Sequence, residues 1–150
     1  MEYSNARIEI KKTDTAFSLI NSGNYDMCFL SLEIDKIPIS IKDIGLWDFR
    51  YYENQDLELI EMAMKEDGFK HASLIHLLAF GAQYPDEQKK GAILGFGSAF
   101  FAAPKMRVTP SLDYLPRPQI RILNQTPIVT QTHRIIFLAV RKVDASLRYH

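Results

Sequence analysis

Histidine is the side chain that most often binds metals or moves protons in enzymes. The sequence contains four: His71, His76, His133 and His150. His71 and His76 are five residues apart, which places them about 140° apart around a helix. They therefore cannot hold one metal ion together, as a pair four residues apart would, and we predict no metal site. Because His76 stands between two large aliphatic residues, we expect a hydrogen-bonded interior histidine and not a general base.

Other groups that could start a reaction are isolated in the sequence. Cys28 is the only cysteine and lies in an apolar run without a basic neighbour, so we expect an unreactive core residue. Asp56, Glu58 and Glu61 are better explained by the dipole of a helix that begins there than by paired acid and base catalysis. The sequence accordingly predicts no catalytic residue and no cofactor. A single cysteine cannot form an internal disulfide, which fits a reducing, cytoplasmic compartment.

Gln88, Lys89, Lys90 and Gly91 form the segment that most resembles an anion-binding loop. We expect a helix to begin here, and the backbone N–H groups of a helix start beside two lysines would bind a phosphate. The segment resembles part of the pyrophosphate-binding loop of the acetyl-coenzyme A-dependent acetyltransferases, although Ile93 replaces the last small residue of that loop. The resemblance implies an alternative function, a small enzyme that binds an acyl-coenzyme A or another phosphate ligand.

Aromatic side chains are concentrated in the segment 45–52, where Trp47, Phe49, Tyr51 and Tyr52 occupy four of the six positions 47–52. Each of them can bury a large area in a core or at an interface. We select Trp47, Tyr51 and Tyr52 as candidate partner-binding residues. The pattern does not decide which secondary structure carries them.

Four of the seven prolines lie within the fifteen residues 104–118. Proline removes a backbone donor and fixes φ, so we expect no regular helix there and predict a stiff arm. Tyr114 and Leu115 would be its apolar anchors, and Arg117 its charged contact with an acidic partner surface. The other interpretation is a crossover that packs Tyr114 and Leu115 against its own sheet.

The zero net charge hides two halves of opposite sign. Residues 1–70 contain fourteen acidic and eight basic side chains, a net charge of −6, and residues 71–150 contain four acidic and ten basic ones, a net charge of +6. The two halves can pair across the folded surface, or they can form a bipolar surface that binds another protein or another copy. The basic second half leaves a nucleic-acid-binding module as a second alternative. The overall neutrality and the lack of a nucleic-acid-binding motif argue against that partner.

Strands are expected near both ends of the chain. Alternation of polar and apolar residues predicts a strand at 7–11, and residues 27–41 are interpreted as a hairpin. The nearly continuous apolar run in 134–143 is typical of a central strand that is covered on both faces.

Helices are expected in the first part and the middle of the chain. A short one follows a cap at Thr13 or Asp14 and ends near Gly23, and a longer one runs from an Asp56 cap to Gly68. Two more are predicted over 72–82 and over 91–103, where small residues recur at every fourth position. The alternative for 91–103 is a break at its internal glycines into two short strands.

Together these elements predict an α+β fold, with a mixed or antiparallel sheet from the N- and C-terminal strands that is covered by the helices of the middle third. We expect one domain over residues 1–150, with the proline-rich arm at 104–118. No targeting segment is evident in the first twenty residues, and no uncharged apolar stretch is long enough to span a membrane. The functional prediction is a non-enzymatic protein-binding or assembly subunit, whose partner is another protein or further copies of itself.

Overall fold

The computed structural model describes residues 7–30, 39–53, 56–104, 106–127 and 134–143. The strands in these ranges are β1 (Arg7–Ile10), β2 (Met27–Cys28), β3 (Gly45–Tyr52), β4 (Lys70–His71), β5 (Ala92–Leu94), β6 (Phe100–Ala103), β7 (Met106–Leu115), β8 (Ile120–Pro127) and β9 (Ile135–Lys142). They form one sheet of order β1-β3-β9-β5-β7-β8-β2, with β4 beside β9 and β6 beside β7. β5 is parallel to β9 and β2 to β8, whereas the other pairs are antiparallel. The sheet is mixed, and the predicted α+β fold is confirmed.

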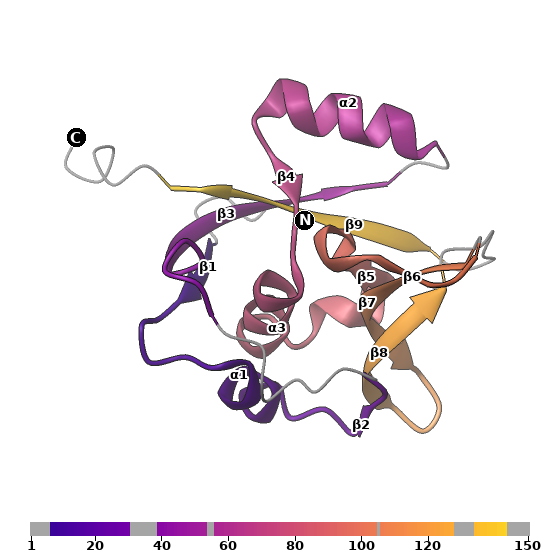
Figure 1. Cartoon of the computed structure of the whole chain (residues 1–150). Helices are drawn as coiled ribbons and strands as arrows, with labels where there is room; N and C mark the ends of the chain where they lie inside the picture. The colour runs from indigo at the N-terminus through magenta and orange to yellow at the C-terminus, as the bar shows by residue number, and fades with distance from the viewer. Residues whose placement is uncertain (1–6, 31–38, 54–55, 105, 128–133, 144–150) are drawn as a thin grey trace.

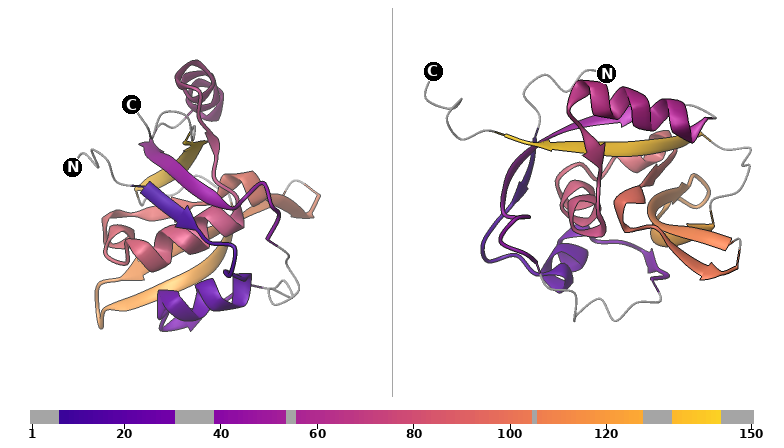
Figure 2. Two further views of the ribbon diagram at one scale, coloured as in Figure 1. Left: turned by 90° about the vertical axis from the view of Figure 1, so that its left-hand side faces the viewer. Right: turned by 45° about the horizontal axis from the view of Figure 1, so that its top comes forward.

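The helices within the same ranges are α1 (Ala16–Gly23), α2 (Leu57–Asp67) and α3 (Leu74–Gln83), with short 3-10 turns η2 (Glu87–Lys90) and η3 (Phe96–Ser98). α1 and α3 lie on one face of the β3 and β9 part of the sheet, and α2 lies on the other (Figures 1 and 2). The sheet therefore separates a larger core under α1 and α3 from a smaller core under α2. None of the helices in the described residues is long and apolar enough to cross a membrane.

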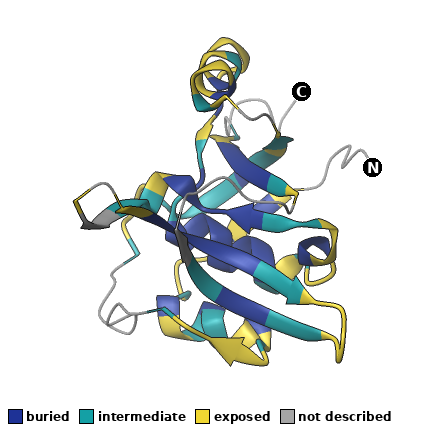
Figure 3. Ribbon diagram, turned by 90° about the vertical axis from the view of Figure 1, so that its right-hand side faces the viewer, coloured by how far each residue is buried: buried dark blue, intermediate teal, exposed yellow. Residues whose placement is uncertain are grey.

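α3 is the central helix of the larger core, as residues 72–82 predict. Every residue from Leu74 to Gly81 is buried, because β1, β7 and α1 pack around it (Figure 3). Its first turn is closed by its own side chains, since the backbone N–H of Ser73 donates to Nδ1 of His76 at 3.1 Å. His76 is thus the interior, hydrogen-bonded histidine that its apolar neighbours predict.

α2 also begins and ends where the sequence predicts. The Asp56 carboxylate accepts a hydrogen bond from the N–H of Glu58 at 2.9 Å, and Gly68 ends the helix with φ 77°, which suits glycine. Only Ile60 and Met64 are buried along its length, and they face Phe69 and Phe137 in the smaller core. The opposite face of α2 is open to solvent.

The N-terminal predictions hold in part. β1 shows the expected alternation of exposed and buried residues. α1 is capped by Thr15, one residue after the predicted caps, and Asn24 rather than Gly23 takes the left-handed conformation that ends it. Cys28 is exposed and not a core residue, because β2 is a two-residue strand at the edge of the sheet. The predicted hairpin over 27–41 is not seen in the described residues, because β2 pairs with β8 and residues 29–30 and 39–41 form no strand. Residues 31–38 lie outside the described residues.

The predicted helix over 91–103 is wrong, and the alternative of two short strands is correct. β5 and β6 are separated by η3, which lies against the backbone before α3. A Cβ atom on Gly97 would be 2.9 Å from the carbonyl oxygens of His71 and Ala72, and one on Gly95 would be 3.2 Å from the Leu77 side chain. The small residues therefore reflect close backbone approach at each glycine and not a helix face.

The proline-rich segment is not an arm, because residues 106–115 form β7, an interior strand of the sheet. β7 pairs with β5, β6 and β8, and its centre is buried. Pro110 fits there because its carbonyl, which accepts from the N–H of Gly95 at 2.9 Å, points into the gap between β5 and β6. A strand residue directs its N–H to the same side as its C=O, so the missing donor falls in that gap. Pro116 and Pro118 lie in the turn between β7 and β8.

Candidate functional site

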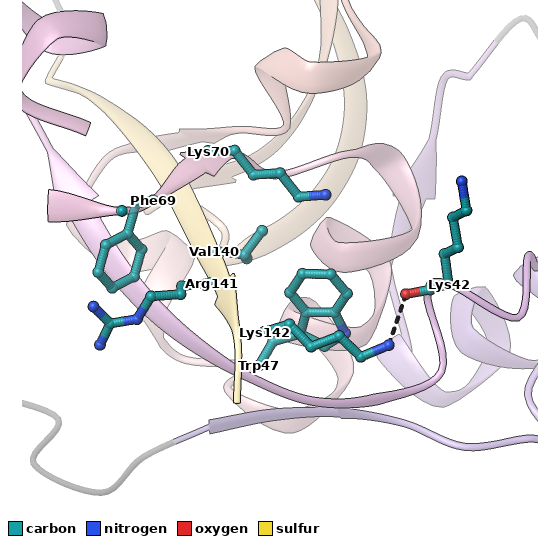
Figure 4. A pocket seen from close by; sticks show the side chains of 8 residues that line it. Lys42, Trp47, Phe69, Lys70, Val140, Arg141 and Lys142 are labelled. Carbon is teal, nitrogen blue, oxygen red and sulfur yellow. Dashed lines mark hydrogen bonds between the residues drawn. The ribbon is translucent and has the colours of Figure 1, made fainter. Parts of the chain in front are cut away.

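An open pocket of about 410 Å³ lies where the end of β9 meets the start of β3 and the end of α2 (Figure 4). Four of its lining side chains are cationic and two are aromatic. The lining residues are Lys42, Trp47, Gly68, Phe69, Lys70, Val140, Arg141 and Lys142. The three segments that supply them are far apart in the sequence and are brought together by the β3–β9 and β4–β9 pairings.

Trp47 forms the floor of one end of this pocket. Its side chain is held in place from two sides, because Nε1 donates to the Asp43 carbonyl at 2.9 Å and the ring meets the His76 imidazole edge-on at 4.3 Å. Only 3% of Trp47 is exposed. The indole is thus a fixed apolar surface under the pocket.

Three lysines line the same end of the pocket as Trp47, and we call Trp47 with Lys42, Lys70 and Lys142 the lysine end. Lys142 pairs directly with Trp47 across the strands, so both side chains lie on the same face of the sheet. The ammonium groups of Lys70 and Lys142 lie 5.1 and 5.5 Å from the indole centroid, and Lys142 also donates to the Lys42 carbonyl at 3.0 Å. These distances are those of cation–π contacts, which keep positive charge beside the ring.

The lysine end carries excess positive charge. Within the described residues, no carboxylate lies within ion-pair distance of Lys42, Lys70 or Lys142. The neighbouring Asp43 uses its carboxylate to accept from the N–H of Ser40 at 3.0 Å. Positive charge beside a buried apolar floor is suited to binding an anion, since the nearby protein weakens the screening by water.

The other end of the pocket is lined by Phe69 and Arg141, and we call it, with the neighbouring Arg50, the arginine end. Its positive charges are neutralised by carboxylates. The guanidinium groups of Arg50 and Arg141 each lie 4.6 Å from the Phe69 ring. Arg50 pairs with Asp67 at 3.1 Å and Arg141 with Asp48 at 3.3 Å. These arginines already hold carboxylates, so an incoming anion is drawn to the lysine end.

His76 contributes no charge to the lysine end at neutral pH. Burial lowers its pKa to about 4, and the positive charges of Lys70 and Lys142 also lower it, against the Asp43 charge. The imidazole is therefore neutral at pH 7. Within the described residues, no group of three or more His, Cys, Asp or Glu side chains is arranged to hold a metal ion.

The three aromatic residues that were candidates for partner binding lie in different parts of the structure. Trp47 lines the pocket. Tyr51 faces the larger core, where it contacts Phe80, and its hydroxyl donates to Glu87 at 2.6 Å. Tyr52 points to the other face of the sheet and donates to Asp67 at 2.5 Å. A strand sends neighbouring side chains to opposite faces, so Tyr52 lies on the other face from Trp47. Tyr51 shares the face of Trp47 but packs in the larger core four residues farther along the strand.

Tyr114, Leu115 and Arg117 lie together at the end of the β7–β8 hairpin, which we call the hairpin tip (residues 114–119). Tyr114 is half-buried, whereas Leu115 and Arg117 are exposed. β7 pairs through β5 with the start of β9, and Lys142 is at the end of β9. Eight residues of strand, about 26 Å, therefore separate the level of the hairpin tip from that of the pocket.

The segment predicted to bind phosphate does not begin an α-helix, and its side chains make contacts within their own fold. The segment enters β5 and not an α-helix, so the backbone donors of a helix start are missing there. Gln88 is buried, and its amide donates to the Asp113 carbonyl at 2.6 Å. Lys89 and Lys90 pair with Asp86 and Glu87 at 3.0 and 2.8 Å, and Gly91 is required because a Cβ atom would lie 2.7 Å from the Arg134 carbonyl oxygen.

The basic residues of the second half do not form one face. Arg121 is used inside the fold, Arg134 binds Glu53 at 2.5 and 2.7 Å, and Arg141 binds Asp48. The last two pairs join the acidic first half to the basic second half, as one of the two charge interpretations predicts. Lys105 lies outside the described residues.

The sequence pointed to Trp47 but not to the three lysines that line the same pocket. They come from a loop, from β4 and from the last residue of β9, so no spacing in the sequence connects them. Comparison of the chain with protein-family models, with curated proteins and with solved structures found no match.

Proposed function

We propose that this chain is a non-enzymatic protein-binding subunit whose lysine end binds an acidic segment of a protein partner. One observation carries the proposal: the ammonium groups of Lys70 and Lys142 lie over the buried Trp47 indole, Lys42 lines the same pocket, and none of these three lysines has a carboxylate partner among the described residues. Carboxylate side chains of the partner supply the opposite charge, and aliphatic side chains of the same segment can pack on the lysine stems above the indole.

The experiment uses the fluorescence of Trp47, which is the only tryptophan of the chain and lies in the pocket. A peptide of alternating glutamate and leucine is titrated against the full chain, with a glutamine-leucine peptide of equal length as control. We expect saturable binding of the acidic peptide alone, which weakens as salt rises from about 50 to about 500 mM, because exposed charges are screened.

The variant Lys70→Gln with Lys142→Gln should weaken binding about tenfold, since each exposed charge contributes about 0.7 kcal/mol. Lys89→Gln is the matched control, because this lysine is also exposed but lies beside Tyr114, near the hairpin tip. Equal binding by both variants, or equal binding of the two peptides, would show that the lysine end is not the site.

Three alternatives to this proposal are tested as well, two by the same titration and one by the melting temperature. Tyr114→Ala with Arg117→Ala removes two side chains of the hairpin tip. A loss of peptide binding in that variant alone would show that the hairpin tip, and not the lysine end, binds the peptide. A short single-stranded oligonucleotide that binds in place of the peptide would favour a nucleic-acid-binding module. Acetyl-coenzyme A at millimolar concentration should leave the melting temperature unchanged, and a clear rise would favour the enzyme alternative.

A further inference from the structure

α2 presents an acidic and apolar surface that its own fold does not use. Leu59 and Met62 are 51% and 62% exposed, and Glu58 and Glu66 are exposed beside them. On an α-helix these four positions fall within an arc of about 100°. We call these four residues the acidic face, and on the helix it lies opposite the buried Ile60 and Met64.

The acidic face complements the lysine end in two properties. Carboxylates at positions 58 and 66 border two exposed aliphatic side chains, and the lysine end presents three lysines, of which Lys70 and Lys142 hold their ammonium groups over the Trp47 indole. Because the indole is buried, a helix laid on the pocket would bring its carboxylates to the ammonium groups and its aliphatic side chains to the lysine stems, which combines charged and apolar contacts as protein interfaces do.

A chain cannot make this contact with itself. Ile60 and Met64 fix α2 in the smaller core, so the acidic face points away from its own sheet. Trp47 belongs to the larger core, on the opposite face of the sheet, and Lys142 shares that face. A second molecule is required to place an acidic face on a lysine end.

We propose that the acidic segment bound by the lysine end is α2 of a second copy of this chain; this inference rests on the proposed function above. Because the acidic face and the lysine end lie on opposite faces of the sheet, the contact is head-to-tail. A head-to-tail contact leaves one acidic face and one lysine end free in each pair, so further copies can add. Because the net charge of the chain is zero, two copies do not repel each other at long range.

The first measurement is the mass distribution of the full chain in solution, by sedimentation velocity from micromolar to millimolar concentration. We expect masses that grow beyond the dimer with concentration and that fall as salt rises. A monomer at every concentration would overturn the inference. If the acidic peptide still binds that monomer, the proposed function stands and only the inference of self-association fails. If the chain neither self-associates nor binds the peptide, the inference and the proposed function both fail.

The second measurement is a charge exchange between the two surfaces. Glu58→Lys with Glu66→Lys reverses the acidic face, and Lys70→Glu with Lys142→Glu reverses the lysine end; each variant alone should lose at least tenfold in association. Mixed in equal amounts, they should associate again, because each contact in an alternating chain then joins opposite charges. The recovery also shows that both variants are folded.

Glu9→Lys with Asp86→Lys is the matched control, since it makes the same charge change at exposed residues outside both surfaces. It should associate like the unaltered chain. An equal loss in this control would attribute the effect to net charge, and association that survives both reversals would place the contact elsewhere. Either result would overturn the inference.

Discussion

Tyr25 is enclosed between two glycines, and this arrangement holds α1 against α3. A Cβ atom at Gly23 would lie 2.3 Å from the ring, and one at Gly81 would lie 2.0 Å from the hydroxyl oxygen. The guanidinium of Arg121 covers the ring at 4.8 Å. Burial raises the pKa of Tyr25 to about 12, and its hydroxyl has no hydrogen-bond partner among the described residues. The two glycines are thus required by the volume of one side chain.

Gly81→Ala should therefore destabilise the protein by about 1–3 kcal/mol, although alanine is the better helix former by about 1 kcal/mol. In a Tyr25→Phe background the cost should be smaller, because the atom at 2.0 Å is gone and the next contacts, Tyr25 Cζ and Leu112 Cδ1, are at 3.2 Å. Urea unfolding of the four proteins of this double-mutant cycle measures the difference. The same cost in both backgrounds would show that the hydroxyl is not the obstacle.

At the scale of elements, Arg121 of β8 joins three parts of the chain. Its guanidinium donates to the carbonyls of Gly23 at the end of α1 and Gly81 in α3, and to the Gln88 amide oxygen in η2. A planar guanidinium can serve several acceptors at once, whereas an ammonium group is a compact point charge. Arg121 therefore fixes the two helices of the larger core against the sheet.

Arg121→Lys should lower the free energy of unfolding by about 3 kcal/mol, because it leaves two or three buried carbonyl and amide oxygens without a donor. Arg117→Lys is the control, since Arg117 is exposed at the hairpin tip, and we expect a change within about 0.5 kcal/mol. Chemical unfolding at one pH compares them. Similar midpoints for the two variants would contradict the role of Arg121 as a link.

Elements with regular periodicity could be predicted from the sequence. α2, α3 and β9 carry caps or apolar patterns that act locally, and the structure confirms them. The secondary structure of residues 91–103 and 104–118 could not be predicted, because their glycines and prolines are required by contacts with residues that are distant in the sequence. The His71 carbonyl beside Gly97 is an example. The candidate site could not be predicted for the same reason. Trp47 can be chosen from the sequence as an aromatic residue, but strand pairing is needed to bring Lys70 and Lys142 to it.

At the scale of the whole molecule, the sheet divides two cores, and one of the two described histidines lies at each: His76 is buried, whereas His71 is partly buried. His76 lies in the larger core against Trp47, and His71 lies between Phe96 and Phe137 in the smaller one. Burial lowers the pKa of both imidazoles, although Glu61 opposes the effect at His71. Both imidazoles are therefore neutral at pH 7.

Stability should fall as the pH drops from 7 towards 4. The pKa of His76 is near 6.5 in the unfolded chain and about 4 in the folded chain. Between these pH values the unfolded chain therefore binds a proton that the folded chain does not bind, and a falling pH favours unfolding. The full difference for His76 is about 3 kcal/mol.

His76→Gln isolates this contribution, because glutamine three residues after Ser73 preserves the closed first turn of α3 and does not titrate. We expect its unfolding free energy to change less between pH 7 and 5 than that of the unaltered chain, with a remainder from His71 and the carboxylates. Urea midpoints at pH 7, 6 and 5 measure the two slopes, with His71→Gln as a parallel variant for the smaller core. Identical slopes for the His76 variant and the unaltered chain would mean that His76 is not kept neutral by burial.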